Sequence, residues 1–264
     1  MIPFFLSYLY LLFFFMENYI LLFLIGLIAG ALNAAAGGGS FITFPAFIYA
    51  GVPPIQANAS STVALFPGSL ASSWKFREYI QPFPNISIKA MLILTLLGGC
   101  AGGLLLLYTP SAGFNLLVPW LLLLGSLAFA FGKQMGYWLR KKIHIGSGLV
   151  LGAQFILGIY GGYFGGAVGI MMMAVWSLFG LSDIKVINAN KTLFTGIANA
   201  AAVILFISAG KVYWPETCTM MAATILGGYF GAHFTKKIDP VKLRTGIVIF
   251  NFVITTVFFI KTYI

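Results

Sequence analysis

Long apolar runs separated by short polar connections occupy almost the whole chain. The runs lie at 18–36, 40–51, 55–74, 87–108, 113–132, 146–166, 168–180, 184–209, 214–234 and 243–262. A helix needs about 20 residues to cross a bilayer, and eight of the runs are long enough. The runs 40–51 and 168–180 are too short to cross alone at about 1.5 Å per residue. The pattern predicts an all-α polytopic membrane protein with two groups of five segments, the second segment of each group being short.

Composition supports a membrane class. Of the 264 residues, 60% are hydrophobic and 8% are charged, whereas about a quarter are charged in soluble domains. We expect one integral domain over 1–264, in contact with membrane lipid. The basic residues of this +10 chain lie in the short connections, as in membrane proteins generally, so nucleic acid is not an expected partner. Residues 1–16 are apolar, and they are an interfacial or partial helix or a lead into the first span.

An internal repeat relates the two groups of segments. The stretch "GVPPIQANASSTVALFPGSLA" (51–71) aligns with "GLSDIKVINANKTLFTGIANAAA" (180–202). We assign repeat one to about 18–132 and repeat two to about 146–262. Such internal symmetry is common in secondary transporters.

The charged connections predict the orientation of the chain. Connections 75–89, 133–144 and 236–244 carry most of the Lys and Arg residues, so we place all three in the cytoplasm. An even number of crossings must then separate the last two connections. We expect five crossings in each repeat, which makes the repeats inverted. Pairing of the short segments with broken neighbours remains an alternative.

A run of three glycines precedes the first short segment. Gly37, Gly38 and Gly39 favour unwound backbone, and Ser40 is expected to cap the next helix. Unwound backbone inside a membrane must be buried in protein or line a wet cavity. Its free N–H groups and the positive end of a half-helix favour an anion. The matching stretch at 160–173 contains three glycines that we include in the candidate site: Gly165, Gly166 and Gly169. The alternative for the regularly spaced glycines is close helix packing.

Two polar stripes occur at equivalent places in the repeats. An offset of 130 pairs Asn58 with Asn188, Thr62 with Thr192 and Ser69 with Asn199. At helical spacing, each stripe lies on one face, and together they predict one substrate-binding cavity. The alternative is that these side chains only join helices to one another.

Lys191 is the one basic residue of the second stripe. It lies about two turns into its helix, at a depth of ~10 Å, and an intramembrane lysine indicates a functional site. The alternative is that it snorkels to the interface. All five acids lie at segment ends, so the substrate is expected to be anionic or neutral. A coupling proton or ion is left open.

Enzyme chemistry is not expected. No nucleophile–base pair or metal-ligand spacing occurs in the sequence, so we assign no catalytic residue, metal or cofactor.

Two stretches resemble the signatures of the TauE/SafE sulfite exporter family, also called the toluene sulfonate uptake permease family. They are "GLIAGALNAAAGGGSFITFPAFIYAGVPPIQANASST" and "ANKTLFTGIANAAAVILFISAGKVYW" (189–214). The resemblance covers about 20–262. It implies a transporter of the bacterial or archaeal inner membrane that handles sulfite, sulfonates or other small sulfur-containing anions. Family members often have a compact glycine cluster in both halves, whereas the second here reads "GGAVGIMMM".

The resulting hypothesis is a secondary transporter that moves a small sulfur-containing anion by alternating access. An anion channel is the first alternative and a membrane-embedded enzyme the second. The exact substrate, the direction of transport and the oligomeric state are left open.

Overall fold

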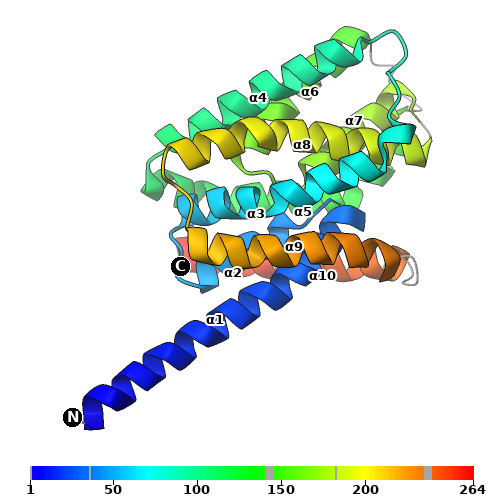
Figure 1. The fold of residues 1–264 in the computed structure, drawn as a ribbon. Coiled ribbons are helices and arrows are strands. Elements are labelled where there is room, and N and C mark those ends of the chain that lie inside the picture. The colour runs from blue at the N-terminus through cyan, green and yellow to red at the C-terminus, as the bar shows by residue number, and fades with distance from the viewer. Residues whose placement is uncertain (1, 36, 141–145, 182, 235–239) are drawn as a thin grey trace.

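The chain folds into helices joined by short connections (Figure 1). The computed structural model describes residues 2–35, 37–140, 146–181, 183–234 and 240–264. Within these ranges no strand occurs, which confirms the all-α class. The helices are α1 (Ile2–Ala35), α2 (Ser40–Tyr49), α3 (Pro54–Lys75), the short 3-10 helix η1 (Arg77–Tyr79), α4 (Ile88–Tyr108), α5 (Ser111–Arg140), α6 (Ser147–Tyr163), α7 (Val168–Phe179), α8 (Ile184–Ser208), α9 (Trp214–Phe234) and α10 (Pro240–Tyr263).

Several helices have the length and hydropathy of membrane spans. In the part of the chain that the structure describes, four meet both criteria: Ile88–Tyr108, Ser111–Gly132, Lys185–Ser208 and Thr245–Tyr263. The helix α1 is continuous from Ile2, so residues 2–16 extend the first apolar segment instead of forming a separate helix. Its N-terminal part projects from the other helices (Figure 1). The protein is therefore a multi-pass membrane protein.

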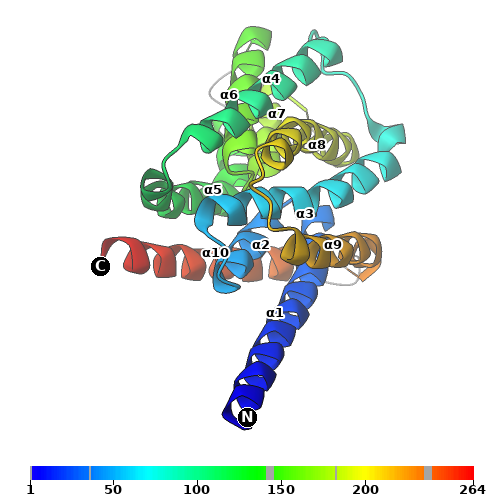
Figure 2. The same cartoon turned by 60° about the vertical axis from the view of Figure 1, so that its left-hand side comes forward.

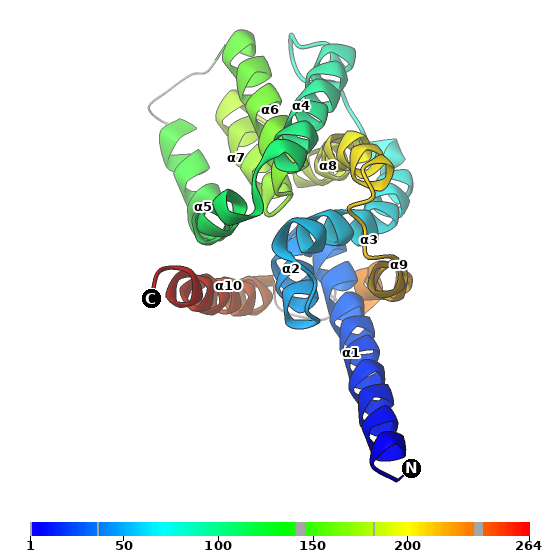
Figure 3. The ribbon, with the colours of Figure 1, turned by 90° about the vertical axis from the view of Figure 1, so that its left-hand side faces the viewer.

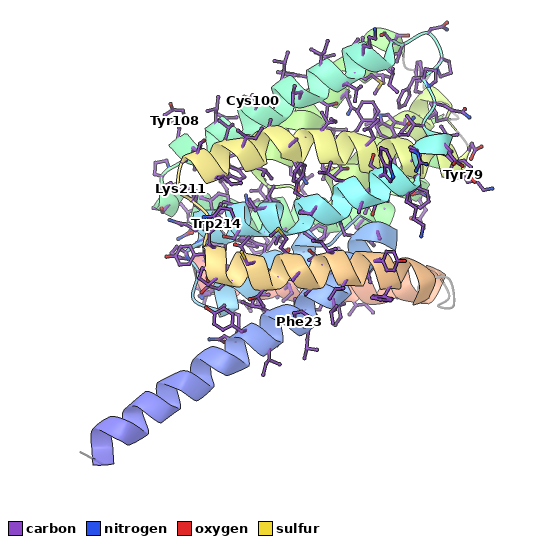
Figure 4. All side chains as sticks on the ribbon, viewed as in Figure 1. Phe23, Tyr79, Cys100, Tyr108, Lys211 and Trp214 are labelled. Atoms are coloured by element: carbon purple, nitrogen blue, oxygen red, sulfur yellow. The ribbon has the colours of Figure 1, made fainter. Side chains whose placement is uncertain are left out.

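The bundle has two ends that serve as references. Tyr108, Lys211 and Trp214 lie at one end, here named the Tyr108 end (Figure 4). Tyr79 lies at the opposite end, here named the Tyr79 end. Since α3 leads to Tyr79, α3 runs from the Tyr108 end to the Tyr79 end, and α4 returns.

Each short helix runs back toward the end from which the preceding long helix came. The helices α1 and α9 run parallel, since Gly26 lies against Ala223 and Gly30 against Gly228. Because α9 begins at the Tyr108 end, α1 runs away from that end. The helix α2 must return to it, since the turn at 50–53 leads directly into α3. By the same reasoning, α6 runs parallel to α4 from the Tyr79 end and α7 returns there.

The expectation of five crossings in each repeat is therefore wrong. Each half consists of a hairpin, α1–α2 or α6–α7, that enters and leaves at the same end, followed by three crossings. The number of crossings per half is still odd, so the halves are inverted. The short segments pair with their broken neighbours. The predicted cytoplasmic side stays a prediction, and connections 133–144 and 236–244 lie partly outside the described residues.

The contacts of one half recur in the other. The pair α1 and α9 matches α6 and α4, and the pair α3 and α9 matches α8 and α4. Viewed end-on, α4, α6 and α7 lie on one side of α3 and α8, and α1, α2 and α9 lie on the other (Figure 3). The equivalent helices α5 and α10 lie side by side (Figure 2). There the hydroxyl groups of Ser126 and Thr255 are 3.3 Å apart.

Glycines allow the closest helix contacts. A Cβ placed on Gly102 of α4 would lie 2.0 Å from the carbonyl oxygen of Ile159 on α6. In the other half, a Cβ on Gly227 of α9 would lie the same 2.0 Å from the carbonyl oxygen of Leu27 on α1. Small residues of this kind bring helix backbones together in membranes. These two tight pairs hold each hairpin against a crossing helix.

Candidate functional site

The two hairpins turn at breaks that share one backbone feature. The helix α1 ends at Ala35 and α2 begins at Ser40, while α6 ends at Tyr163 and α7 begins at Val168. In both breaks a glycine adopts the left-handed conformation, with φ of 76° at Gly37 and 77° at Gly165. Only glycine adopts this region without a steric cost. The residues directly before the short helices differ, because Gly39 has a φ of −57° and Ala167 a φ of 59°.

The second break leaves backbone donors unpaired. The N–H groups of Gly166, Ala167 and Val168 make no hydrogen bond within the residues that the structure describes. Ser40 does not cap α2 as expected: Gly39 occupies the N-cap position, and no side chain caps this end. Ser40 is instead the first helical residue.

A small cavity lies where the two breaks meet α3 and α8. Residues from both halves line it: Asn33, Gly37, Ser40, Thr62, Leu65, Ser69, Gly165, Val168, Gly169, Thr195 and Asn199. The first residues of α2 and α7 are both in its wall. The positive ends of two half-helices therefore lie at one cavity, as in broken-helix transporter sites.

The remaining glycines of the two clusters are packing residues. A Cβ on Gly38 would lie 3.2 Å from the Phe129 ring, and a Cβ on Gly39 would lie 2.9 Å from the carbonyl oxygen of Ala29. A Cβ on Gly166 would lie 2.9 Å from the Phe164 ring. Gly38, Gly39 and Gly166 do not line the cavity, because neighbouring groups occupy the space beside them.

The helix α8 presents two unpaired polar atoms at the cavity. Thr195 Oγ1 and Asn199 Oδ1 are buried and have no hydrogen-bond partner among the described residues. They lie one helical turn apart, and both residues line the cavity. Buried polar atoms are nearly always paired in native proteins. Two orphaned atoms in one cavity indicate a place where a polar ligand or water completes the bonding.

Lys191 lies beside the cavity and is buried by protein. It is 2% exposed, and its Cγ lies 2.9 Å from the position of a Cβ on Gly169. Its Nζ lies 3.6 Å from the position of a Cβ on Gly37, which lines the cavity. The side chain therefore crosses from α8 to the first helix break and does not snorkel to an interface.

Three further predicted site residues, besides Lys191 and the packing glycines, are not among the residues that line the cavity. Asn58 donates through Nδ2 to the carbonyl oxygen of Tyr163 at 2.9 Å and so holds the end of α6 against α3. Thr192 donates to the carbonyl oxygen of Ala189 in its own helix. Asn188 is half-buried and is not part of the cavity lining. Asn58 and Thr192 therefore make hydrogen bonds within the protein, and none of the three residues faces the cavity.

Five of the lining residues were not among the individually predicted substrate-binding residues. Two of them, Ser69 and Thr195, belong to the polar stripes that were predicted to line one cavity. Asn33 is a lone polar residue in an apolar segment, and its Nδ2 donates to Ser69 Oγ at 3.3 Å. Leu65 and Val168 are apolar, and the sequence holds no signal that separates them from core residues.

The arrangement suits an anion. Two helix N-termini and the Lys191 ammonium place positive charge at the cavity, and polar side chains from both halves provide donors. No carboxylate lies among the lining residues, and the described residues contain no group of acidic, Cys and His side chains able to hold a metal ion.

Replacement of Gly37 by alanine should impair binding more than folding. A non-glycine residue in the left-handed region costs about 1–2 kcal/mol, and the new methyl group would lie 3.6 Å from Lys191 Nζ. Gly51→Ala is the matched control, since Gly51 has a φ of 83° and open space beside it. We expect similar losses of thermal stability in both variants and a loss of affinity for a small anion in Gly37→Ala alone. Equal affinities in the two variants would exclude Gly37 from the site.

Comparison with known proteins identifies the family. The profile of "Sulfite exporter TauE/SafE" matches residues 22–258. A "Probable membrane transporter protein" of Haemophilus influenzae is 32% identical over 239 residues, which cover 89% of this chain and 92% of that protein.

Two further relatives have similar descriptions. The "Probable membrane transporter protein YfcA" of Escherichia coli K12 is 28% identical over 89% of this chain and 87% of its own length. The "Probable membrane transporter protein ORF9" of a Sinorhizobium species is 28% identical over 81% of each chain. No solved structure matches. The paired helix breaks and the extent of the family match together show that this chain is a membrane transporter of the TauE/SafE sulfite exporter family.

Proposed function

We propose that this protein is a secondary transporter of the cell membrane that moves a small sulfur-containing anion, such as sulfite or a sulfonate, by alternating access. The convergence of two half-helix N-termini on one cavity is the observation that carries the proposal. Broken helices of this kind bind anionic groups in other transporter folds. The sulfur-containing substrate class comes from the family resemblance.

Binding uses groups from both halves of the chain. Ser40, Thr62 and Asn33 are supplied by the first half, and Thr195 and Asn199 by the second. A ligand that contacts both halves stabilises one arrangement of the hairpins relative to the crossing helices. Rocking of one repeat against the other then exposes the cavity to each side in turn. The chain carries out no covalent chemistry in this scheme and needs no cofactor.

Reconstitution into liposomes tests the proposal. We expect saturable uptake of radiolabelled sulfite, and counterflow when unlabelled sulfite is trapped inside. Empty liposomes are the control. Uptake that does not saturate, shows no counterflow and is accompanied by anion conductance would establish a channel instead. An absence of uptake for sulfite, thiosulfate and methanesulfonate would overturn the proposed substrate class.

Thr195→Val should weaken anion binding without lowering stability. The hydroxyl group has no partner in the ligand-free protein, so its removal breaks no hydrogen bond. A bond to a charged ligand contributes about 1.5–3 kcal/mol, so sulfite affinity should fall about tenfold or more. The measurements are calorimetry with sulfite and the melting temperature in detergent.

Thr256→Val is the control for this change. Thr256 is exposed on α10 and donates to the carbonyl oxygen of Phe252 in its own helix. Its replacement should leave sulfite affinity at the wild-type value. Wild-type affinity in Thr195→Val would remove that hydroxyl from the binding site.

A further inference from the structure

Lys191 is buried without a counter-charge. Its side chain is 2% exposed, and it has no hydrogen bond or ion pair with any residue in the described part of the chain. A Cβ on Gly37 would lie 3.6 Å from its Nζ and a Cβ on Gly169 would lie 2.9 Å from its Cγ, and both glycines line the cavity. A buried lysine without a partner is unusual, because a buried charge is nearly always paired, and in a membrane protein it indicates a functional site.

The elements packed against α8 provide no carboxylate for it. These elements are α3, α4, α6, α7 and η1, and their titratable groups are Lys75, Lys89, Cys100, Tyr108, Tyr160, Tyr163, Arg77, Glu78 and Tyr79. Tyr160 donates to the carbonyl oxygen of Leu121, and the Tyr163 hydroxyl lies 3.3 Å from Thr109 Oγ1. Glu78 is exposed, and on α8 itself Asp183 accepts bonds from the first backbone N–H groups of the helix.

Lys191 lacks a negatively charged partner, and the proposed substrate is negatively charged. An unpaired ammonium is costly in an apolar interior, and an anion in the adjacent cavity would compensate it. The anion would otherwise be an unpaired charge in the same interior. A proton on Lys191 and an anion in the cavity therefore favour each other, and by linkage each raises the affinity for the other.

We propose that Lys191 is the proton-binding site of this transporter, and that each anion crosses the membrane together with one proton carried on the Lys191 amine. This inference rests on the proposed function. The Nζ lone pair accepts a proton from water on one side, the anion binds beside the ammonium, and both are released on the other side. When the site is loaded, the ammonium of Lys191 and a monovalent anion have a net charge of zero. When the site is empty, Lys191 is an uncharged amine. Neither state therefore carries an uncompensated charge through the membrane.

A variant with a permanent charge separates exchange from net transport. Arginine stays protonated at any pH reached in proteins. The Lys191→Arg variant can therefore bind an anion, but its anion-free site stays charged during the conformational change that returns it to the first side. We expect counterflow of sulfite in this variant within a few-fold of wild type, and net uptake reduced at least tenfold. Lys185→Arg, at an exposed position of the same helix, should behave as wild type in both assays. Wild-type net uptake in Lys191→Arg would overturn the proposal.

Proton movement is measured directly with an anion that carries no proton. Methanesulfonate and thiosulfate are ionised at neutral pH, so acidification reported by a dye inside liposomes must come from coupled protons. We expect acidification with wild-type protein and none with Lys191→Arg. If Lys191→Arg does not fold, Lys191→Met takes its place, and the uptake that it retains should proceed without acidification.

The two proposals fail in different ways. Anion uptake by the wild type without a change of internal pH would overturn the proton site and leave the transport function standing. Uptake of none of the three anions would instead overturn the proposed function.

Discussion

Replacement of Lys191 by methionine should lower sulfite affinity about ten- to a hundred-fold. Charge-assisted contacts contribute about 1.5–3 kcal/mol, and each 1.4 kcal/mol changes affinity about tenfold. Methionine keeps much of the length of the side chain, so the contact with Gly169 is largely preserved. The folded protein should be at least as stable as wild type, because a buried amine without a hydrogen-bond partner is replaced by an apolar side chain. Calorimetry with sulfite and the melting temperature in detergent measure the two effects.

Lys185→Met is the control, because it removes the same charge at an exposed position on the same helix. Its sulfite affinity should equal that of wild type. If Lys191→Met also retains wild-type affinity, the helix N-termini and the Thr195 hydroxyl group must bind the anion without it. A strong loss of folded protein in Lys191→Met would show that the ammonium has a structural partner.

Gly102→Ala should cause the largest loss of stability. The new Cβ would lie 2.0 Å from the carbonyl oxygen of Ile159 and 2.7 Å from the Tyr163 backbone nitrogen. Both atoms belong to the helix backbone, so α4 and α6 must separate. Overpacking costs about 1–3 kcal/mol and occasionally more, and we expect the upper end of that range here. The melting temperature and the yield of monodisperse protein in detergent report the effect.

Gly152→Ala, on the outer face of α6, tests whether the close approach is the cause. Nothing lies within 4 Å of a Cβ at this position, so the change should be neutral or slightly stabilising. Gly227→Ala should destabilise as much as Gly102→Ala, because its Cβ would meet a backbone carbonyl oxygen, that of Leu27, at the same 2.0 Å. Similar melting temperatures for Gly102→Ala and Gly152→Ala would contradict this account of the interface.

Much of the helix order could be predicted from hydropathy, and the path of the short helices could not. The glycines before Ser40 and Val168 indicate where a helix must break. A short apolar helix after a break has the same composition whether it continues across the membrane or turns back. Its direction depends on contacts with distant helices, such as Gly30 with Gly228. That information is spread over the chain and appears in no local pattern.

The site was predicted in part for a related reason. Gly37, Thr62 and Asn199 line the cavity. Each is a polar residue or a glycine, and each has an equivalent position in the other repeat. Asn58 belongs to the same stripe, yet its amide binds the carbonyl oxygen of Tyr163. A helical stripe is broad enough to face a cavity on one edge and a neighbouring backbone on the other. The sequence does not distinguish those edges.

The break between α6 and α7 constrains the order in which the protein can assemble during synthesis. Its unpaired N–H groups could not face lipid, where an unsatisfied backbone group costs several kcal/mol. The Asn58 amide of α3, which is made earlier, is available to hold the end of α6, but α8 is made later. In a nascent chain that ends before α8, the break between α6 and α7 is therefore uncovered on the side where α8 will pack. The α6–α7 hairpin should become resistant to proteolysis only after α8 has left the ribosome and inserted.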